Sequence, residues 1–407
     1  MDAAFFSANR RRLLEKLEPG SFVAVAGNGS MQRSSDEAYA FEQDPDFWYL
    51  TGIEEPDWQL FIDVDSREEW LVAPHLNRYH TAFHSGMTPD TATKRTGVGT
   101  VLGTKEGKAL LQKLLGQKKR GYTVVPPSTR VYGFQTNPGP RKLIAQLKGV
   151  ERTDMRLTLA KLRAIKQPVE IEAIQAAVDV TVDGLLTLIR ELKTYRTENE
   201  ADARLYYEFR RRGGRHGFDP IVASGRKTCI LHSAPANDPL DDWLLLDVGA
   251  RVNGYTADIT RTIPLHPPTG RQVQVYEAVQ RMHDHFESVV KPGAPVRDVL
   301  MKDAYLYVGE EMVKLGLLKK PLLDHDHVFK FMPHGITHGL GIDVHDPLGR
   351  PEFFAEGMVL TNEVGVYIPE EGFGVRIEND MVITADGVRN MAAKLPFDLD
   401  TLASMVY

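Results

Sequence analysis

The sequence reads Leu244-Leu245-Leu246-Asp247-Val248-Gly249, then Asn253-Gly254-Tyr255, then Asp258-Ile259-Thr260-Arg261-Thr262. An Asn-Gly pair between two runs of β-forming residues is a strong signal for a hairpin with a two-residue turn. With Asn253 and Gly254 at the centre of that turn, Val252 pairs with Tyr255 and Asp247 lies opposite Thr260. Because side chains alternate along a strand, Asp247 and Asp258 then point from the same face of the hairpin.

The environment of these two aspartates suggests chemistry. Asp247 follows three leucines, so we expect it to be buried, where an unpaired charge is costly. Two neighbouring buried carboxylates need a cation or a shared proton. The alternative is an aspartate that caps a turn together with an aspartate on the surface, and the hairpin alone leaves this alternative open.

Histidines are concentrated in the segment His334-Gly335-Ile336-Thr337-His338-Gly339-Leu340-Gly341-Ile342-Asp343-Val344-His345. It holds three of the 13 histidines of the chain. The four-residue step from His334 to His338 could suggest a zinc-binding helix, but the glutamate of that motif is missing and the glycines oppose a helix. The segment therefore predicts a glycine-rich turn and strand that bring imidazoles to a site, with structural histidines as the alternative.

Two further carboxylates lie in apolar runs near the C-terminus. Glu363 falls within residues 358–368 and Glu378 within residues 375–383. These runs predict two antiparallel strands connected by residues 369–374. The two-residue period places Arg376 on the same face as Glu378. The alternative for this pair is an ion-pair ladder on the surface.

Together, the four carboxylates and one histidine could meet in one site. Four ionised carboxylates could not stay together in a buried cluster without cations, and two divalent ions would neutralise them. Hard oxygen donors with a single imidazole favour Mn²⁺-like ions over a thiolate-type zinc site. Two such ions activate water for hydrolysis.

The chain is too long for one hydrophobic core, since its 407 residues correspond to about two or three domains. The first 150 residues alternate strands and helices, which predicts a small α/β domain. We expect strands at residues 22–26, 60–64, 70–73 and 122–125 and a helix at 108–115. Helices are expected over residues 157–193, with Pro168 in the first turn of a new helix, and over 272–290. We place the domain boundary between residues 152 and 153, giving domains 1–152 and 153–407.

Composition excludes several classes of partner. Lysine and arginine number 49 against 55 acidic residues, a formal charge of −6, so no global field favours nucleic acid or an anionic membrane. The single cysteine, Cys229, allows no intrachain disulfide and fits a reducing compartment. We find neither a secretory signal nor an apolar run of membrane-spanning length. A cytoplasmic protein without nucleic-acid or membrane partners is expected.

The sequence resembles the pita-bread metallopeptidase family, and within it the aminopeptidase P group. The Asp247…Asp258-Ile-Thr-Arg-Thr block, the His338 segment, the Glu363 strand and the Arg376-Ile377-Glu378 strand occur in the order typical of the family. The stretches 32–36 and 46–52 resemble its amino-terminal domain. The resemblance implies an α/β (α+β) protein, in which a smaller creatinase-like α/β domain precedes a pita-bread catalytic domain.

The resemblance also implies roles for the residues of the site. The five metal-ligand positions would be Asp247, Asp258, His338, Glu363 and Glu378, with Asp258 and Glu378 bridging two divalent ions. Glu363 would also transfer protons, His232 and His345 would be catalytic, and His334 and Arg376 would bind substrate. Mn²⁺ is the expected ion, with Zn²⁺ or Co²⁺ as alternatives. The chain departs from the family at Val364, where proline is usual, and at Gly339, where a bulky residue is common.

The implied activity is release of the N-terminal residue from peptides with proline in the second position, by a homodimer or homotetramer. The nearest alternative is an Xaa-Pro dipeptidase, which shares all five ligand positions. A methionine aminopeptidase fits less well, because it lacks a comparable amino-terminal domain. A non-catalytic binding protein on the same fold is a further alternative, although such relatives, like the metal-free creatine amidinohydrolase, have lost ligand residues.

Overall fold

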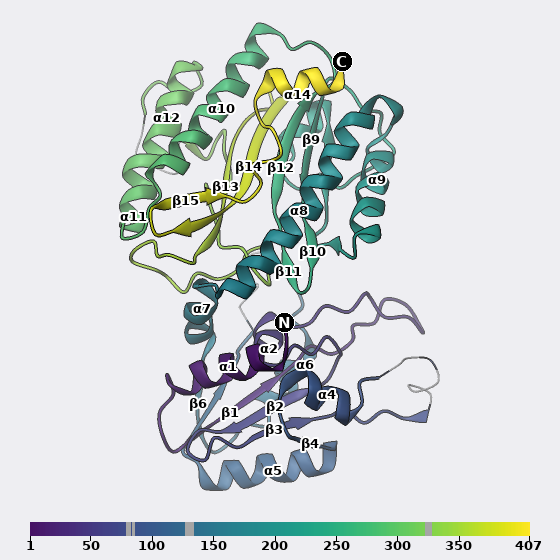
Figure 1. The fold of residues 1–407 in the computed structure, drawn as a ribbon, viewed down its shortest axis with the longest axis vertical. Coiled ribbons are helices and arrows are strands. Elements are labelled where there is room, and N and C mark those ends of the chain that lie inside the picture. Colours follow the sequence, from purple (N-terminus) through teal and green to yellow (C-terminus); the bar gives the residue numbers. More distant parts are fainter. Residues whose placement is uncertain (79–82, 84–85, 127–133, 322–327) are drawn as a thin grey trace. The chain divides into compact units, whose positions relative to one another are not determined.

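The fold was analysed in a computed structural model that describes residues 1–78, 83, 86–126, 134–321 and 328–407. The chain forms two compact units, Met1–Leu162 and Arg163–Tyr407 (Figure 1). These units divide within helix α7 (Arg156–Ala164). Our domain boundary between residues 152 and 153 stays a prediction.

The first unit contains a six-stranded mixed sheet in the order β4-β3-β2-β1-β5-β6. β1 pairs antiparallel with β2 and parallel with β5. The elements of this unit are α1 (Ala3–Leu14), β1 (Ser21–Ala26), α2 (Pro45–Thr51), β2 (Gln59–Asp63), β3 (Glu69–Val72), α4 (Pro89–Thr96), β4 (Thr100–Leu102), α5 (Thr104–Gln117), β5 (Arg120–Thr123), α6 (Pro138–Ile144) and β6 (Glu151–Asp154).

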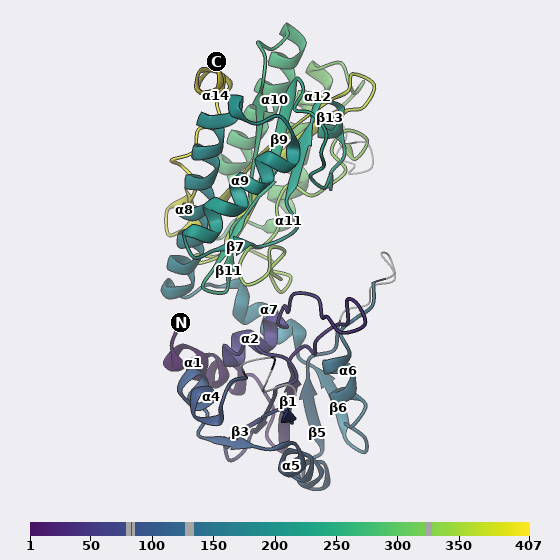
Figure 2. The ribbon, with the colours of Figure 1, turned by 90° about the vertical axis from the view of Figure 1, so that its right-hand side faces the viewer.

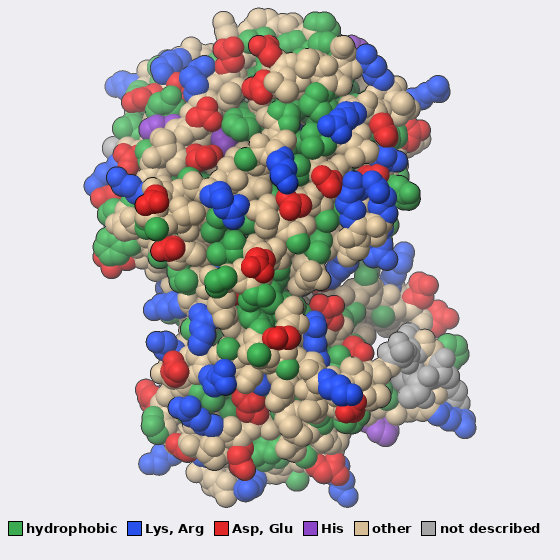
Figure 3. Space-filling model, viewed as in Figure 1, with side chains coloured by type: hydrophobic (Ala, Val, Ile, Leu, Met, Phe, Trp, Pro, Cys, Tyr) green, Lys and Arg blue, Asp and Glu red, His purple; other side chains and the backbone are tan. Residues whose placement is uncertain are grey.

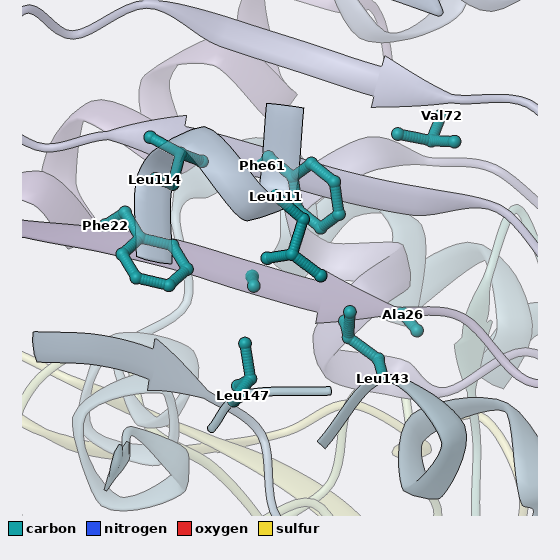
Figure 4. Close-up of a cluster of buried hydrophobic side chains, with 9 residues drawn as sticks. Phe22, Ala26, Phe61, Val72, Leu111, Leu114, Leu143 and Leu147 are labelled. Atoms are coloured by element: carbon teal, nitrogen blue, oxygen red, sulfur yellow. The ribbon is translucent and has the colours of Figure 1, made fainter. Parts of the chain in front are cut away.

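The core of the first unit lies against the central strand β1, all six residues of which are buried. Phe22 packs with Phe61 of β2 and with Leu111 and Leu114 of α5 (Figure 4). Each such side chain stabilises the fold by about 1.5–3 kcal/mol through burial. The predicted strands at residues 22–26, 60–64 and 70–73 and the predicted helix are confirmed. The strand predicted at residues 122–125 lies two residues earlier, at Arg120–Thr123.

Two strands of the first unit carry no apolar run and were not predicted. β4 has only three residues, none of them buried. β6, Glu-Arg-Thr-Asp, lies at the edge of the sheet beside β5 and is largely exposed. Edge strands are often short and charged, so hydrophobic patterning does not reveal them.

The second unit carries three small sheets and a set of covering helices (Figures 1 and 2). α10 packs on β13 and β14, and α8 packs on β10 and β11. Its elements are α8 (Pro168–Glu191), η1 (Leu192–Thr194), α9 (Glu198–Arg211), β7 (Arg215–His216), β8 (Ile221–Ser224), η2 (Gly225–Cys229), β9 (Trp243–Val248), β10 (Ala250–Val252), β11 (Tyr255–Thr256), β12 (Ile259–Pro264), α10 (Gly270–Val289), α11 (Val296–Asp298), η3 (Val299–Ala304), α12 (Tyr305–Lys314), β13 (Val359–Ile368), β14 (Phe373–Thr384), β15 (Gly387–Asn390) and α14 (Leu399–Val406).

The two long helices begin where local sequence predicts. Pro168 is the first residue of α8, and Gln167 and Glu170 form a capping box around it. Proline suits this position because its missing N–H would have no partner in the first helical turn. Thr269 caps α10 in the same way, with Gln272 as its reciprocal partner. Both helix predictions are confirmed.

The predicted hairpin is present with the predicted register. Val252 pairs with Tyr255, and Thr260 of β12 pairs with Asp247 of β9. Asn253 and Gly254 adopt positive φ angles of 52° and 86°, as a two-residue turn of this kind requires. A Cβ at Gly249 would lie 1.6 Å from the carbonyl oxygen of Ala257 across the hairpin, so only glycine fits this close approach.

Strands β13 and β14 pair antiparallel and place Glu363 directly opposite Glu378. β14 also lies beside β12, joined by side-chain hydrogen bonds instead of a ladder. The Arg376 amide donates to the Thr262 hydroxyl at 3.0 Å, and this hydroxyl donates to the Arg376 carbonyl at 3.0 Å. The hairpin and the C-terminal strand pair, which are far apart in sequence, therefore present their carboxylates to one place.

The histidine segment forms no helix, as predicted, but the prediction of a strand is wrong in detail. Only Gly339 makes an isolated bridge, to Leu360 of β13. The amides of Thr361 and Glu363 donate to the carbonyls of His338 and Ile336 at 3.0 and 2.9 Å. The His338 amide, however, donates to the Thr361 hydroxyl, not to its carbonyl. A side chain thus replaces one step of the ladder, so the segment follows β13 without becoming a regular strand.

No helix in the described part of the chain is long and apolar enough to cross a membrane. On the face drawn in Figure 3, acidic and basic side chains are interspersed.

Candidate metal centre

A pocket of about 580 Å³ opens in the second unit. Its wall includes every residue that the sequence singled out for chemistry: His232, Asp247, Asp258, His334, His338, His345, Glu363, Arg376 and Glu378. Four separate parts of the fold supply them. Asp247 and Asp258 come from the hairpin, Glu363 and Glu378 from the paired strands β13 and β14, and the histidines from two loops.

The closest group of potential ligands consists of Asp258, His338 and Glu378, whose ligand atoms all lie within 4.8 Å of one another. Nε2 of His338 lies 3.5 Å from Oδ2 of Asp258 and 3.6 Å from Oε1 of Glu363. One imidazole therefore faces two carboxylates, one from the hairpin just before β12 and one from β13.

The donor atoms of this cluster fit divalent cations. Oδ1 of Asp247, Oδ1 of Asp258 and Oε1 of Glu378 are buried, and none has a hydrogen-bond partner among the described residues. A buried carboxylate oxygen without a partner is costly, and several in one cavity more so. Oxygen donors of this number with one imidazole match a hard cation such as Mn²⁺ better than a thiolate-type zinc site.

The electrostatics of the cluster lead to the same conclusion. Burial, reinforced by the neighbouring Glu378 and Asp247, raises the pKa of Asp258 well above its usual value. Burial and the Glu378 charge likewise raise the pKa of Glu363. The pKa of Glu378 rises to about 8, because it is buried and lies near Asp247. Positive charge in the pocket would allow all of these carboxylates to ionise.

Burial also keeps the imidazoles of the pocket neutral. It lowers the pKa of His338 to about 4, with a further contribution from His345. The pKa of His334 falls to about 3, because of burial and of the nearby Arg376 charge. Neutral imidazoles can act as metal ligands or as hydrogen-bond donors near neutral pH.

Glu378 is held from both sides by residues of β12. The Thr260 hydroxyl donates to Oε2 of Glu378 at 2.7 Å, which leaves the other oxygen free. The fully buried Arg261 donates to the Glu378 carbonyl and to Oδ1 of Asn379, both at 2.8 Å. These bonds fix the carboxylate without using its second oxygen.

Arg376 links Asp247 to Tyr367 and, through Tyr367, to His334. Its Nη2 donates to Oδ2 of Asp247 at 2.6 Å, and its Nη1 donates to the Tyr367 hydroxyl at 2.7 Å. The Tyr367 hydroxyl also bonds Nε2 of His334 at 2.8 Å. Sequence analysis did not single out Tyr367. The signal was available, because Tyr367 lies four residues after Glu363 and so on the same face of the strand.

Asp380 is a second residue that sequence analysis missed. Its Oδ2 accepts the Asp258 amide at 3.0 Å, while its Oδ1 is buried without a partner among the described residues. Burial raises its pKa well above the usual value. It therefore fixes the backbone of Asp258 from behind the cluster.

Apolar side chains and two more histidines also line the pocket. Phe218, Leu231 and Val344 line the wall near His232 and His345. The rings of His345 and His338 pack edge to face with centroids 4.2 Å apart. Burial lowers the pKa of His345. A neutral imidazole beside an apolar wall can donate a hydrogen bond to a substrate oxygen next to a nonpolar substrate group.

Buried carboxylates and imidazoles that meet in one pocket of a mixed α/β unit are typical of a metal-dependent hydrolase. The chain belongs to metallopeptidase family M24, whose model matches residues 172–385, and the aminopeptidase P N-terminal domain model matches residues 6–124. The predicted fold class, a smaller domain followed by a pita-bread domain, is confirmed.

The chain is similar along its whole length to known Xaa-Pro aminopeptidases. The Xaa-Pro aminopeptidase of Escherichia coli is 30% identical, over 98% of this chain and 97% of the relative. The structure of aminopeptidase P from E. coli with the inhibitor Pro-Leu matches with a TM-score of 0.88 and 27% identity, over 100% of this chain and 98% of the other. The zinc-substituted E. coli enzyme in complex with product matches with a TM-score of 0.86 and 26% identity, again over 100% and 98%.

Proposed function

We propose that this protein is a dinuclear metal-dependent aminopeptidase that removes the N-terminal residue from peptides with proline in the second position. The observation that supports it most is the meeting of Asp247, Asp258, His338, Glu363 and Glu378 in one pocket. The similarity to Xaa-Pro aminopeptidases over the whole chain supports the substrate class.

These five residues are proposed as the ligands of two ions, with Asp258 and Glu378 bridging. Their unpaired buried oxygens and raised pKa values support the assignment. Mn²⁺ is proposed as the ion on the basis of the oxygen-rich donor set, with Zn²⁺ or Co²⁺ as alternatives. When bound, the two ions polarise the scissile carbonyl and activate a water molecule.

Glu363 is proposed to move the proton. Its carboxylate lines the pocket, with Oε1 3.6 Å from Nε2 of His338 and Oε2 3.5 Å from Nδ1 of His334. A carboxylate there can accept a proton from the attacking water and return it to the proline nitrogen as the peptide bond breaks. Burial raises the pKa of Glu363, which favours the return of the proton.

His345 and His232 are proposed to stabilise the oxyanion that forms on the carbonyl oxygen. Within the part of the chain that the structure describes, the His345 ring makes no hydrogen bond, so a ring N–H is available to substrate. Removing one such donor typically costs about 10²–10³-fold in turnover. The apolar wall formed by Leu231 and Val344 suits a proline ring.

His334 and Arg376 are proposed to bind the peptide beyond the scissile bond. Tyr367 fixes both through its hydroxyl, so their donor directions are set before substrate arrives. Such preorganisation lowers the entropic cost of binding.

Three further proposals concern the protein as a whole. A cytoplasmic location is proposed on the basis of the single cysteine. A homodimer or homotetramer is proposed from the family resemblance. We also retain domains 1–152 and 153–407 as the proposed division of the chain.

Cleavage of matched peptides tests the proposed function. With Mn²⁺ supplied, the purified protein should release the first residue of Ala-Pro-Ala and of longer Ala-Pro peptides, but not of Ala-Ala-Ala. Cleavage of the dipeptide Ala-Pro alone would instead identify a dipeptidase. Cleavage of Ala-Ala-Ala at a similar rate would contradict the proline requirement.

A further inference from the structure

A buried cluster of charged side chains, Asp346, Arg163 and Lys166, lies outside the metal centre and contacts the loop that carries His345. Asp346 follows His345 directly, and its side chain is 1% exposed. It forms ion pairs with Arg163, 2% exposed, and with Lys166, whose Nζ lies 2.9 Å from Oδ2 of Asp346. No ligand position is involved.

Such a cluster is poorly explained by stability alone. Taking charges out of water costs several kcal/mol per ion, and apolar replacements of buried ion pairs are often neutral or stabilising. Asp346 also makes bonds that a purely stabilising pair would not need. Its Oδ1 accepts the Asp343 amide at 3.2 Å, and its own amide donates to the Gly339 carbonyl at 2.8 Å.

These bonds close residues 339–346 into a tight loop. A Cβ at Gly339 would lie 2.3 Å from the Asp346 carbonyl oxygen, and one at Gly341 would lie 2.7 Å from Oδ2 of Asp346. Both glycines therefore leave room for Asp346. A bulky residue, common in the family at position 339, would displace this contact.

The two imidazoles of the loop are held by different means. His338 lies on the part that follows β13, where its amide and carbonyl bond Thr361. His345 lies beyond this support, one residue before the charge cluster. Lys166 is itself fixed, because its amide donates to the Gly357 carbonyl at 2.9 Å just before β13. The cluster thus ties His345 to the same strand that carries Glu363.

We propose that Asp346, together with Arg163 and Lys166, is a positioning device that sets the place of the His345 imidazole in the pocket. This inference rests on the proposed function, since His345 is assigned there to the oxyanion. Misplacing a catalytic group by about 1 Å can cost about 10²-fold in rate. Metal binding should be kept when Asp346 is changed, because the four carboxylates lie outside this loop and the His338 backbone is held by Thr361, while the His338 ring keeps its own bond to the Gly339 carbonyl.

A double-mutant cycle tests this role. Asp346→Asn and His345→Ala are made singly and together, and kcat and KM are measured on Ala-Pro-Ala with Mn²⁺. We expect His345→Ala to lose about 10²–10³-fold in kcat and Asp346→Asn about 10²-fold, with little change in KM. The double variant should be no slower than His345→Ala, since the positioned ring is gone. Bound Mn²⁺ per chain should equal that of the wild type.

Two further variants separate positioning from folding. Lys166→Met leaves the Arg163–Asp346 pair intact. If Asp346→Asn does not fold, Lys166→Met takes its place in the double-mutant cycle. Glu208→Gln is the matched control, because Glu208 is 1% exposed and pairs with arginines of α9 outside the pocket. Its kcat should equal that of the wild type.

The outcomes are distinguishable. Losses that multiply in the double variant, or loss of bound Mn²⁺ in Asp346→Asn, would overturn the positioning role. An unchanged kcat in both Asp346→Asn and Lys166→Met would also overturn it. A wild-type protein that cleaves no Xaa-Pro peptide would overturn the proposed function, and this inference with it.

Discussion

At the scale of the residue, the pocket contains carboxylates that would bind cations and other groups that hold these carboxylates in place. The carboxylates Asp258, Glu363 and Glu378 have raised pKa values, which is costly unless cations bind. The Thr260 hydroxyl donates to Glu378, Arg376 donates to the Tyr367 hydroxyl, and the Asp258 amide donates to Asp380, and these bonds hold the groups in place. Burial of unneutralised charge is a common sign of a functional site.

Glu363 provides the first prediction. Replacing Glu363 with alanine removes the proposed proton carrier, so we expect turnover of Ala-Pro-Ala to fall below detection while far-UV circular dichroism is unchanged. Glu356→Ala, at an exposed residue just before β13, is the matched control and should keep wild-type activity. Near-normal rates in Glu363→Ala would refute its role.

Tyr367 provides the second. In Tyr367→Phe the buried Arg376 and His334 lose a shared hydrogen-bond partner, which costs about 1–3 kcal/mol. We expect kcat/KM to fall by about 10-fold or more. Tyr276→Phe removes a hydroxyl bonded to the Phe397 carbonyl, away from the pocket, and should leave kcat/KM unchanged. Equal effects of the two variants would show that the Tyr367 hydroxyl has no special role.

The charged residues of the site could be predicted from the sequence, but the residues that hold them in place could not. Asp247 and Asp258 were recognisable because carboxylates in apolar strands are unusual. Tyr367 and Asp346 were not, because a tyrosine in a strand and an aspartate in a loop are common without any function. The role of Asp346 depends on a contact with Arg163, a residue more than a hundred positions away. The role of Tyr367 depends on contacts with Arg376 and His334.

At the scale of the element, the hairpin of β9 to β12 determines the geometry of the first two carboxylates. Its register followed from the Asn-Gly turn and the alternation of side chains, and the structure confirms it. The histidine segment was harder, because the Thr361 hydroxyl takes the place of a backbone partner. Patterns of residue type do not reveal that a side chain has taken the place of a backbone hydrogen-bond partner.

The close contact at Gly249 provides a test of the hairpin geometry. A methyl group in Gly249→Ala would meet the Ala257 carbonyl oxygen at 1.6 Å, so the strands must move apart and displace Asp247 and Asp258. We expect a loss of about 3 kcal/mol or more in the free energy of unfolding, together with weaker Mn²⁺ binding, by denaturant titration and calorimetry. Gly116→Ala, in an exposed helical position with open space, should be neutral or slightly stabilising. A Gly249→Ala variant as stable as wild type would contradict the close strand contact.

At the scale of the whole molecule, stability should depend on metal and pH together. Without metal, the pKa of Glu378 rises from 4.5 to about 8. A carboxyl whose folded pKa is raised stabilises the fold below its unfolded pKa, and this stability is lost as pH rises through the folded pKa. The chelated protein should therefore melt at lower temperature as pH increases from about 5 to about 8.

Mn²⁺ should reverse this trend, because the ions bind ionised carboxylates. We expect the difference in Tm between Mn²⁺-loaded and chelated protein, measured by scanning calorimetry, to grow over the same interval. In chelated Glu378→Gln the fall in Tm with pH should be smaller than in the wild type, with the remainder due to the raised pKa values of Asp258 and Glu363. A chelated wild-type Tm that rises with pH would contradict the assignment of a buried carboxylate cluster.

The central claim is that Asp247, Asp258, His338, Glu363 and Glu378 hold two divalent ions in one pocket. Anomalous scattering from Mn²⁺-soaked crystals tests it most directly. We predict two anomalous peaks about 3.5–4 Å apart between these side chains, and at most one in Asp258→Asn. A wild-type map with no peak there, or with a single ion that leaves part of the carboxylates without a cation, would contradict the account.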